Sequence, residues 1–171
     1  RGNPFAEKNR LCLVGLRLHH EDGTVENKTW KIEYDTTPYA GAITDIKAHV
    51  SVCSLVVGFN LKFDLAWLAR YGISLPTSCR VFDCQLAEFI LDAQRTPYPS
   101  LDGCLSKYGL PLKSRAVGEY WDLGIDTPDI PYDILSSYLR DDLARTDELY
   151  QTLLPRCSNP LYGLHMQDER V

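Results

Sequence analysis

The first third of the chain alternates apolar and polar segments in the manner of a β-hairpin. Residues 11–18 form an apolar run, and apolar and polar side chains alternate over residues 29–34. An Asp-Gly pair at positions 22–23 lies between the two segments as a turn signal. We therefore expect two antiparallel strands here, followed by a short helix around residues 42–49.

Two strand–helix units and a long helix follow, and with the hairpin they predict an α/β fold. The apolar segment at residues 54–59 is typical of a buried strand, and it runs directly into a helix over residues 60–71, for which Gly72 is the stop signal. Residues 81–83 and 84–91 repeat this order of strand and helix. The rest of the chain is predicted as a short helix over residues 101–108, a loop-rich stretch over residues 111–131 and a helix over residues 132–154, between Pro131 and Pro155.

The composition is that of an ordinary soluble domain. The chain has 171 residues, of which 44% are hydrophobic and 24% charged, enough for one domain with a substantial core. The net charge of −5 argues against coating duplex nucleic acid with a basic surface, although an enzyme that grips one strand end remains compatible. No apolar run approaches the roughly 20 residues that span a bilayer. The polar first ten residues show no signal peptide, so we expect no membrane partner, no secretion, and a cytoplasmic location, the host cytoplasm if the protein is viral.

Several common kinds of site are absent from the sequence. Neither GxxxxGK[ST] nor GxGxxG occurs, which excludes the corresponding nucleotide-binding classes, and there is no GxSxG elbow. The six cysteines form no Cys-x-x-Cys pair and have no histidine at zinc-like spacing. Most of them lie in apolar stretches, so we expect buried, reduced thiols.

The candidate chemistry lies in two pairs of residues at equal spacing. Asn60 precedes Asp64 by four residues in one predicted helix, and Tyr138 precedes Asp142 by four in another. Residues four apart share one face of a helix. If both faces meet at a common cleft, the two carboxylates come together, which is costly unless a cation such as Mg²⁺ or Mn²⁺ lies between them. Convergent carboxylates, a divalent metal and a tyrosine hydroxyl suit phosphodiester hydrolysis.

Each of these residues also has a common structural role. Asp64 alone could complement a helix dipole, and Asn60 alone could be a helix N-cap. Tyr138 alone could be a core aromatic, and Asp142, which lies between two arginines, could belong to a solvated ion-paired face. The combination of the four favours a functional site.

Three further charged residues have two interpretations each. Asp83 follows a predicted strand and is interpreted as a helix cap rather than a ligand. Lys113 and Arg115 lie in the loop-rich stretch, where they are either phosphate contacts or solvated charges.

The segments around the two pairs resemble known motifs. Residues 57–68, which contain Asn60 and Asp64, and the segment that runs from Tyr138 through Asp142 resemble the second and third motifs of a nuclease family. That family is the 3′–5′ proofreading exonuclease domain of family A, phage-type DNA polymerases, in the DEDD superfamily with a tyrosine in the third motif. The segments at residues 82–87, 100–105 and 121–127 are also similar to this domain.

The resemblance implies a fold, a partner and a site. The fold would be RNase H-like, a mixed sheet flanked by helices, over residues 1–160, with residues 161–171 beginning the connection to a polymerase domain. Two divalent metal ions, Mg²⁺ or Mn²⁺, would be held in part by Asp64 and Asp142, and Tyr138 would orient the attacking water. The substrate would be the 3′ end of single-stranded DNA. The residues implied to lie near that strand are Asn60, Lys62 and Phe63.

One motif of the family is absent between Arg1 and Val171. The family carries Asp-x-Glu on its opening strand, and no Asp-x-Glu occurs in this sequence. Residues 11–18 resemble the family's second strand. We therefore expect the opening strand to lie upstream of Arg1, and the chain as given to be inactive by itself.

Two other functions stay open at this point. An RNA 3′–5′ exonuclease similar to ribonuclease D would share both motifs, and only residues 121–127 and the C-terminal tail favour DNA. A non-catalytic scaffold, an exonuclease-like domain that packs against a polymerase, is the other alternative.

Overall fold

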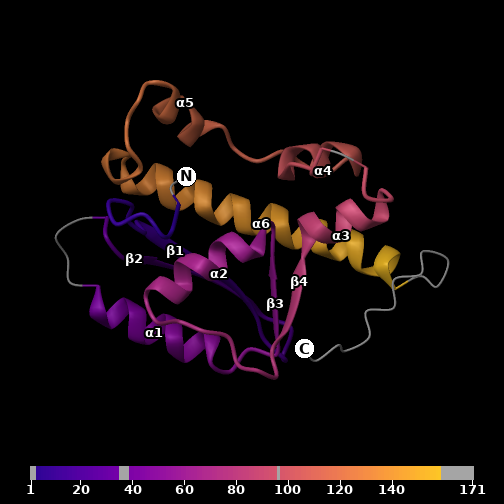
Figure 1. Cartoon of the computed structure of the whole chain (residues 1–171), viewed down its shortest axis with the longest axis horizontal. Coiled ribbons are helices and arrows are strands. Elements are labelled where there is room, and N and C mark those ends of the chain that lie inside the picture. Colours follow the sequence, from indigo (N-terminus) through magenta and orange to yellow (C-terminus); the bar gives the residue numbers. More distant parts are fainter. Residues whose placement is uncertain (1–2, 35–38, 96, 159–171) are drawn as a thin grey trace.

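The hairpin is present as the sequence predicts. The computed structural model describes residues 3–34, 39–95 and 97–158 (Figure 1). Strand β1 (Leu13–His19) pairs antiparallel with β2 (Val25–Lys31), so that Leu13 lies opposite Lys31. Gly23 has φ of +84° in the connecting turn, a conformation that suits glycine because it has no Cβ.

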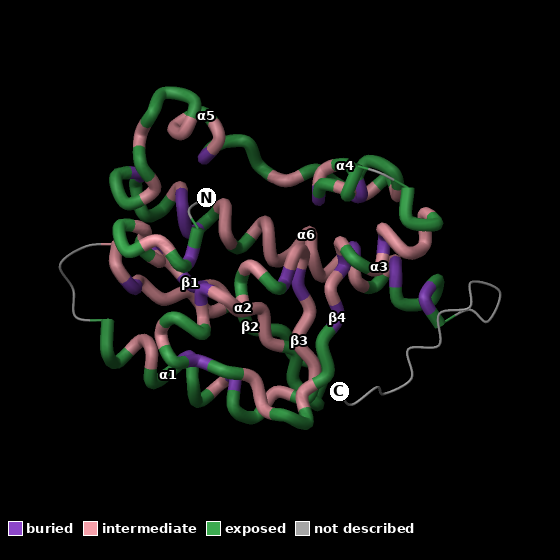
Figure 2. Tube along the Cα trace, viewed as in Figure 1, coloured by how far each residue is buried: buried purple, intermediate pink, exposed green. Residues whose placement is uncertain are grey.

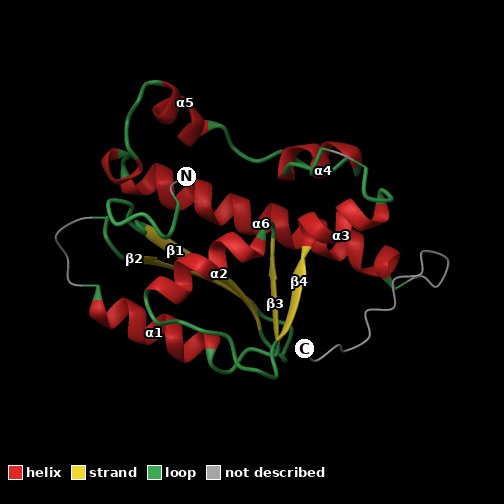
Figure 3. Cartoon of the chain, viewed as in Figure 1, coloured by secondary structure: helices red, strands yellow, loops and turns green. Residues whose placement is uncertain are grey.

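The two strand–helix units are also confirmed, and they form a second small sheet. Strands β3 and β4 are parallel, with Leu55 opposite Arg80 and Gly58 opposite Asp83 (Figure 3). Because the strands are parallel and in register, their C-terminal ends meet at one edge of the sheet, and a helix begins at each. The bounds are β3 (Leu55–Gly58), α2 (Leu61–Arg70), β4 (Arg80–Asp83) and α3 (Cys84–Leu91).

The remaining helices surround the two sheets. The longest, α6, runs along the molecule, with α4 and α5 on one side and the strands and α1 on the other (Figure 1). The predicted α/β fold is thus confirmed, with its strands arranged as one antiparallel and one parallel pair. The bounds are α1 (Ala40–Val50), α4 (Leu101–Lys107), α5 (Ala116–Asp122), the 3-10 helix η1 (Thr127–Asp129) and α6 (Tyr132–Cys157).

Two predictions about the C-terminal half were wrong. The stretch over residues 111–131 contains α5 and η1, because Val117 and Ile130 are fully buried against Leu135 of α6. A helix of seven residues gains its stability from such packing rather than from its own sequence. Pro155 lies inside α6 instead of ending it, and the helix continues to the buried Cys157.

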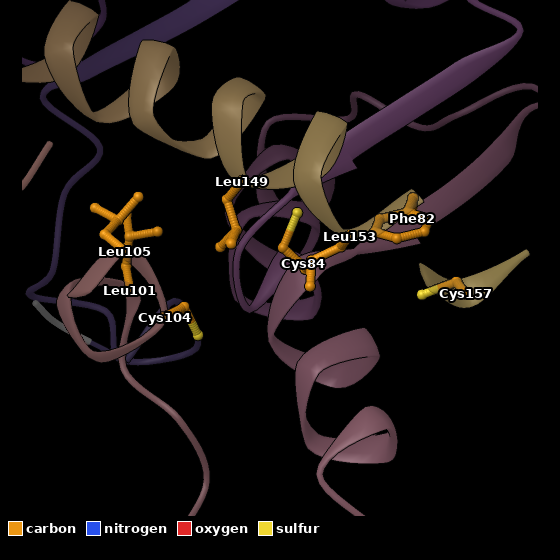
Figure 4. Packing of buried hydrophobic residues seen from close by; sticks show 8 residues of the cluster. All are labelled: Phe82, Cys84, Leu101, Cys104, Leu105, Leu149, Leu153 and Cys157. Atoms are coloured by element: carbon orange, nitrogen blue, oxygen red, sulfur yellow. The ribbon is translucent and has the colours of Figure 1, made fainter. Parts of the chain in front are cut away.

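Much of the core forms where α6 packs against its neighbours, and a further buried cluster lies between the hairpin and α1. Helix α6 contacts β1, β3, α3, α4 and α5, and buried positions gather along these contacts (Figure 2). A Cβ on Gly15 would lie 2.9 Å from Leu139, so β1 approaches α6 closely only because this residue is glycine. Figure 4 shows the main cluster of buried side chains, which are Phe82, Cys84, Leu101, Cys104, Leu105, Leu149, Leu153 and Cys157.

This packing fixes α6 relative to the C-terminal edge of β3 and β4. Helix α6 carries Tyr138 and Asp142, while Asp64 lies just beyond that edge. Within the described ranges, no helix has the length and apolar character needed to cross a membrane. The expected connection at residues 161–171 lies outside the described residues.

Candidate active site

Asp83 joins the starts of two helices at the sheet edge. Its carboxylate accepts hydrogen bonds from Gln85 N at 2.9 Å in α3 and from Leu61 N at 2.9 Å in α2. It also accepts one from Asn60 N at 3.0 Å. A carboxylate at a helix N-terminus satisfies free N–H groups and complements the helix dipole. The interpretation of Asp83 as a cap is confirmed for α3, and the structure extends it to α2.

Asn60 does not cap α2 through its side chain. It occupies the N-cap position of α2 with φ of 57° and ψ of 47°, and its side chain makes no capping hydrogen bond. Asp83 accepts from the N–H groups of Asn60 and Leu61, whereas a side-chain cap at Asn60 would accept from those of Lys62 or Phe63. Asparagine tolerates the left-handed conformation better than most residues. The amide side chain of Asn60 is thus not committed to holding the helix.

Asp64 lies at the start of α2 and faces other carboxylates. The residue is exposed to solvent, although protein lies near its carboxylate on most sides. Desolvation, followed by the negative charges of Asp142 and Asp83, raises the pKa of Asp64 to about 7. All three influences oppose ionisation. The structure therefore brings Asp64 and Asp142 together as the sequence predicts, and we call these two residues the acidic pair.

Asp142 is the more enclosed member of the acidic pair. Its Oδ1 atom is shielded from solvent and has no hydrogen-bond partner among the described residues. Lys113 Nζ lies 3.6 Å from this atom, an ion pair beyond hydrogen-bonding distance. Desolvation raises the pKa of Asp142, Lys113 counteracts it, and Asp141 and Asp102 add to it. A buried carboxylate oxygen without a partner is costly, and it marks a position where a ligand could bind.

Tyr138 combines a packed ring with a hydroxyl in the site. Its ring meets Trp121 edge to face, with centroids 6.0 Å apart. Its hydroxyl oxygen accepts a hydrogen bond from Lys113 Nζ at 3.3 Å. Tyr138 precedes Asp142 by one turn of α6. Its hydroxyl and the Asp142 carboxylate therefore both lie close to the ammonium group of Lys113.

Asp102 was not predicted as a member of this site, and Lys113 was interpreted only as a phosphate contact or a solvated charge. Lys113 stands between Tyr138 and Asp142, and the charges of these two groups raise its pKa despite desolvation, which acts in the opposite direction. Asp102 of α4 has a second shielded carboxylate oxygen without a described partner, and its charge acts on both Lys113 and Asp142. Neither residue belongs to a spaced pair, so no pattern in the sequence connects it with Asp142.

Among the described residues, Lys62 and Phe63 are not bonded to the acidic pair through their side chains. Lys62 is exposed and Phe63 is half-buried, both on the first turn of α2. In the part of the chain that the structure describes, no hydrogen bond or ion pair joins either side chain to Asp64 or Asp142. Their role in binding a strand stays a prediction.

The acidic pair fits part of a divalent metal site. Carboxylate oxygens are the ligands that Mg²⁺ and Mn²⁺ prefer, and Asp142 Oδ1 is an oxygen of this kind without a hydrogen-bond partner among the described residues. Among the described side chains, no group of three or more His, Cys, Asp or Glu residues is placed to hold a metal ion. Mg²⁺ is commonly bound through one or two carboxylates together with water and substrate phosphates, so a pair can contribute to such a site without enclosing it.

Comparison with known families identifies the class of this domain. The model of the 3′–5′ exonuclease domain of family A DNA polymerases matches residues 2–157. The chain therefore belongs to this family and is a 3′–5′ exonuclease domain, which confirms the resemblance seen in the sequence. Comparison with curated proteins and with solved structures gave no significant match.

Proposed function

We propose that this domain is a metal-dependent exonuclease that removes nucleotides from the 3′ end of single-stranded DNA, as the proofreading part of a DNA polymerase. The observation that carries the proposal is the acidic pair. Asp64 and Asp142 come from helices far apart in the sequence, and desolvation together with the charge of Asp142 raises the pKa of Asp64 to about 7. Two carboxylates held so close are costly in a metal-free protein and useful in one that binds cations.

Asp64 and Asp142 would hold two Mg²⁺ or Mn²⁺ ions together with other oxygen ligands. When bound, such ions supply positive charge to the attacking and leaving oxygens of the phosphodiester. Asp64 must release its proton before its carboxylate can bind a cation. A pKa near 7 places this release within the physiological range.

Tyr138 would position the attacking water. Its hydroxyl oxygen accepts a hydrogen bond from Lys113, which leaves the hydroxyl proton free to be donated to a water molecule. The edge contact with Trp121 holds the ring, so the direction of the hydroxyl is set before a substrate arrives. Positioning of this kind lowers the entropic cost of the reaction.

The strand would be held by residues near the edge of the parallel sheet. Asn60 has a side-chain amide that does not cap α2 and can contact the terminal nucleotide. Lys62 is exposed and suits a phosphate, and Phe63 offers a ring face for stacking. Such contacts bind single strands without reading their sequence.

The test is the release of mononucleotides from a 3′-labelled single strand in the presence of Mg²⁺ or Mn²⁺, measured with this domain as part of the full-length polymerase in which the proposal places it. Asp64→Asn and Asp142→Asn should each lower the rate by a factor on the order of 10³, because each removes a ligand charge that supports several kcal/mol of transition-state stabilisation. Asp133→Asn is the matched control, since Asp133 is exposed in the first turn of α6. It should retain the parental rate.

The same assay separates the alternatives. Faster degradation of a matched RNA strand would indicate an enzyme similar to ribonuclease D. A folded parental protein that neither binds Mg²⁺ nor degrades either strand would indicate a non-catalytic scaffold. Parental turnover in Asp64→Asn or Asp142→Asn would contradict the proposed roles of the acidic pair.

A further inference from the structure

We propose that Cys53 and Cys79 are a site of reversible oxidation, at which a disulfide joins the starting ends of β3 and β4. This site lies at the opposite end of the parallel strands from Asp83 and the acidic pair. It does not depend on the proposed function, because the modification concerns the scaffold and not the substrate.

The geometry of the parallel pair brings the two thiols into contact. Cys53 precedes β3 by two residues and Cys79 directly precedes β4. A hydrogen bond of 3.0 Å from Arg80 N to Ser54 O holds the two starting ends together. The two Sγ atoms lie 3.4 Å apart. A disulfide requires about 2.05 Å between sulfurs, so the atoms need to approach by only roughly 1.4 Å.

Accessibility distinguishes this pair from the other cysteines. Cys53 and Cys79 are half-buried, so the expectation of buried thiols was wrong for them because both lie in loops at the rim of the sheet. A small oxidant can reach half-buried sulfurs, whereas fully buried thiols are inert. The cysteines whose burial confirms the expectation are Cys12, Cys84, Cys104 and Cys157.

The chemistry balances with a low-molecular-weight disulfide such as glutathione disulfide as the oxidant. The Cys53 thiolate attacks one sulfur of the oxidant, which forms a mixed disulfide and releases one thiolate. The Cys79 thiolate then attacks Cys53 Sγ and releases the second. The two protein thiols lose two protons and two electrons, and the oxidant is reduced to two thiols.

The order of the two attacks follows from the surroundings of Cys79. Desolvation, and then the hydrogen bond with Cys53, raise the pKa of Cys79 to about 11. A thiol that is rarely ionised is a poor first nucleophile. It can still act in the second step, because its target sulfur is already in contact with it. We therefore assign the first attack to Cys53.

The bond should stabilise the domain without displacing the acidic pair. It would close a loop that contains β3 and α2, and such a cross-link restricts the unfolded chain. We expect the thermal midpoint to rise by roughly 5–10 °C. The carboxylates at the other end of the strands should keep their arrangement.

The experiment treats the native 171-residue chain with glutathione disulfide, followed by thiol counting, mass measurement and peptide mapping. Two of the six thiols should be lost, the mass should fall by two hydrogen atoms, and the linked peptides should contain Cys53 and Cys79. Cys79→Ser should take up one glutathione at Cys53 instead, Cys53→Ser should react much more slowly, and neither variant should show the rise in the midpoint. Cys12→Ala is the control, in which the same pair should still close.

Two results would overturn the proposal. One is six free thiols after prolonged oxidation of the native protein. The other is a disulfide that involves any of the four buried cysteines while the protein is folded.

Discussion

Two regions of the molecule combine a carboxylate, a lysine and a tyrosine, and they use them differently. In the core, Glu88 is 2% exposed, and its two carboxylate oxygens accept hydrogen bonds from Lys107 Nζ at 2.5 Å and from Tyr108 OH at 2.6 Å. At the sheet edge, Lys113 donates to Tyr138 rather than to Asp142. The carboxylate of Asp142 keeps only an ion pair at 3.6 Å.

The difference lies in which acceptor atoms are satisfied. Both oxygens of Glu88 are hydrogen-bonded, which is what a buried carboxylate needs in order to stabilise a fold. Asp142 has a shielded oxygen without a described partner. Residue types alone therefore do not separate a structural group from a functional one. An acceptor without a hydrogen bond does distinguish them. Its desolvation destabilises the folded protein, and a ligand that binds there can remove this destabilisation.

The largest expected effect is a difference in stability between variants of Lys107 and Lys113. Lys107→Met should lower the free energy of unfolding by about 3 kcal/mol, because it leaves the Glu88 carboxylate buried without its cation. Lys113→Met should change it by less than about 1 kcal/mol, because the Asp142 side chain is 35% exposed and can take up water or a proton. Urea unfolding of both variants tests this. Equal losses would mean that the Asp142 group is as structural as the Glu88 group.

A second pair of variants compares the two tyrosines. Tyr138→Phe should lower the exonuclease rate by about 10²-fold with little change in stability, because it removes a hydroxyl that positions water while the ring still packs. Tyr108→Phe should cost about 1–2 kcal/mol of stability and leave turnover unchanged, because a buried oxygen of Glu88 loses its donor. Turnover assays and urea unfolding give both values. Parental turnover in Tyr138→Phe would assign Tyr138 to the core.

The smallest expected effect is a dependence of the protein's stability on pH, caused by the titration of Asp64. The pKa of Asp64 is about 7 in the folded protein against an ordinary value of 3.8, so the folded state binds more protons between these limits. The metal-free protein should therefore lose stability as pH rises from about 4 to about 7, and Asp64→Asn should remove this part of the dependence. Solvent contact of Asp64 weakens the slope.

The same titration predicts metal binding. Because cations compete with the proton on Asp64, the apparent affinity for Mg²⁺ should fall below pH 7 by at most tenfold per pH unit. Thermal shifts with and without Mg²⁺, measured across this range for the parental protein and Asp64→Asn, test both statements. An identical pH profile for the two proteins would show that Asp64 titrates at its ordinary pKa.

The sequence by itself predicted most of the elements and the two carboxylates that the structure brings together. Periodicity and turn signals located the hairpin, the two strand–helix units and α6, because these patterns arise within single segments. The spacing of Asn60 with Asp64, and of Tyr138 with Asp142, identified the acidic pair. The family of the chain could be recognised from the same motifs.

Only the tertiary structure decided which residues from distant segments contact one another. Asp83 supports the start of α2 across the parallel sheet, and the side chain of Asn60 makes no capping hydrogen bond. Lys113 reaches Tyr138 and Asp142 from a loop, and Cys79 meets Cys53 at the rim of the sheet. A sequence pattern restricts residues that follow one another in one element. Contacts between elements depend on how their buried faces pack, and this is why no pattern in the sequence predicted these three.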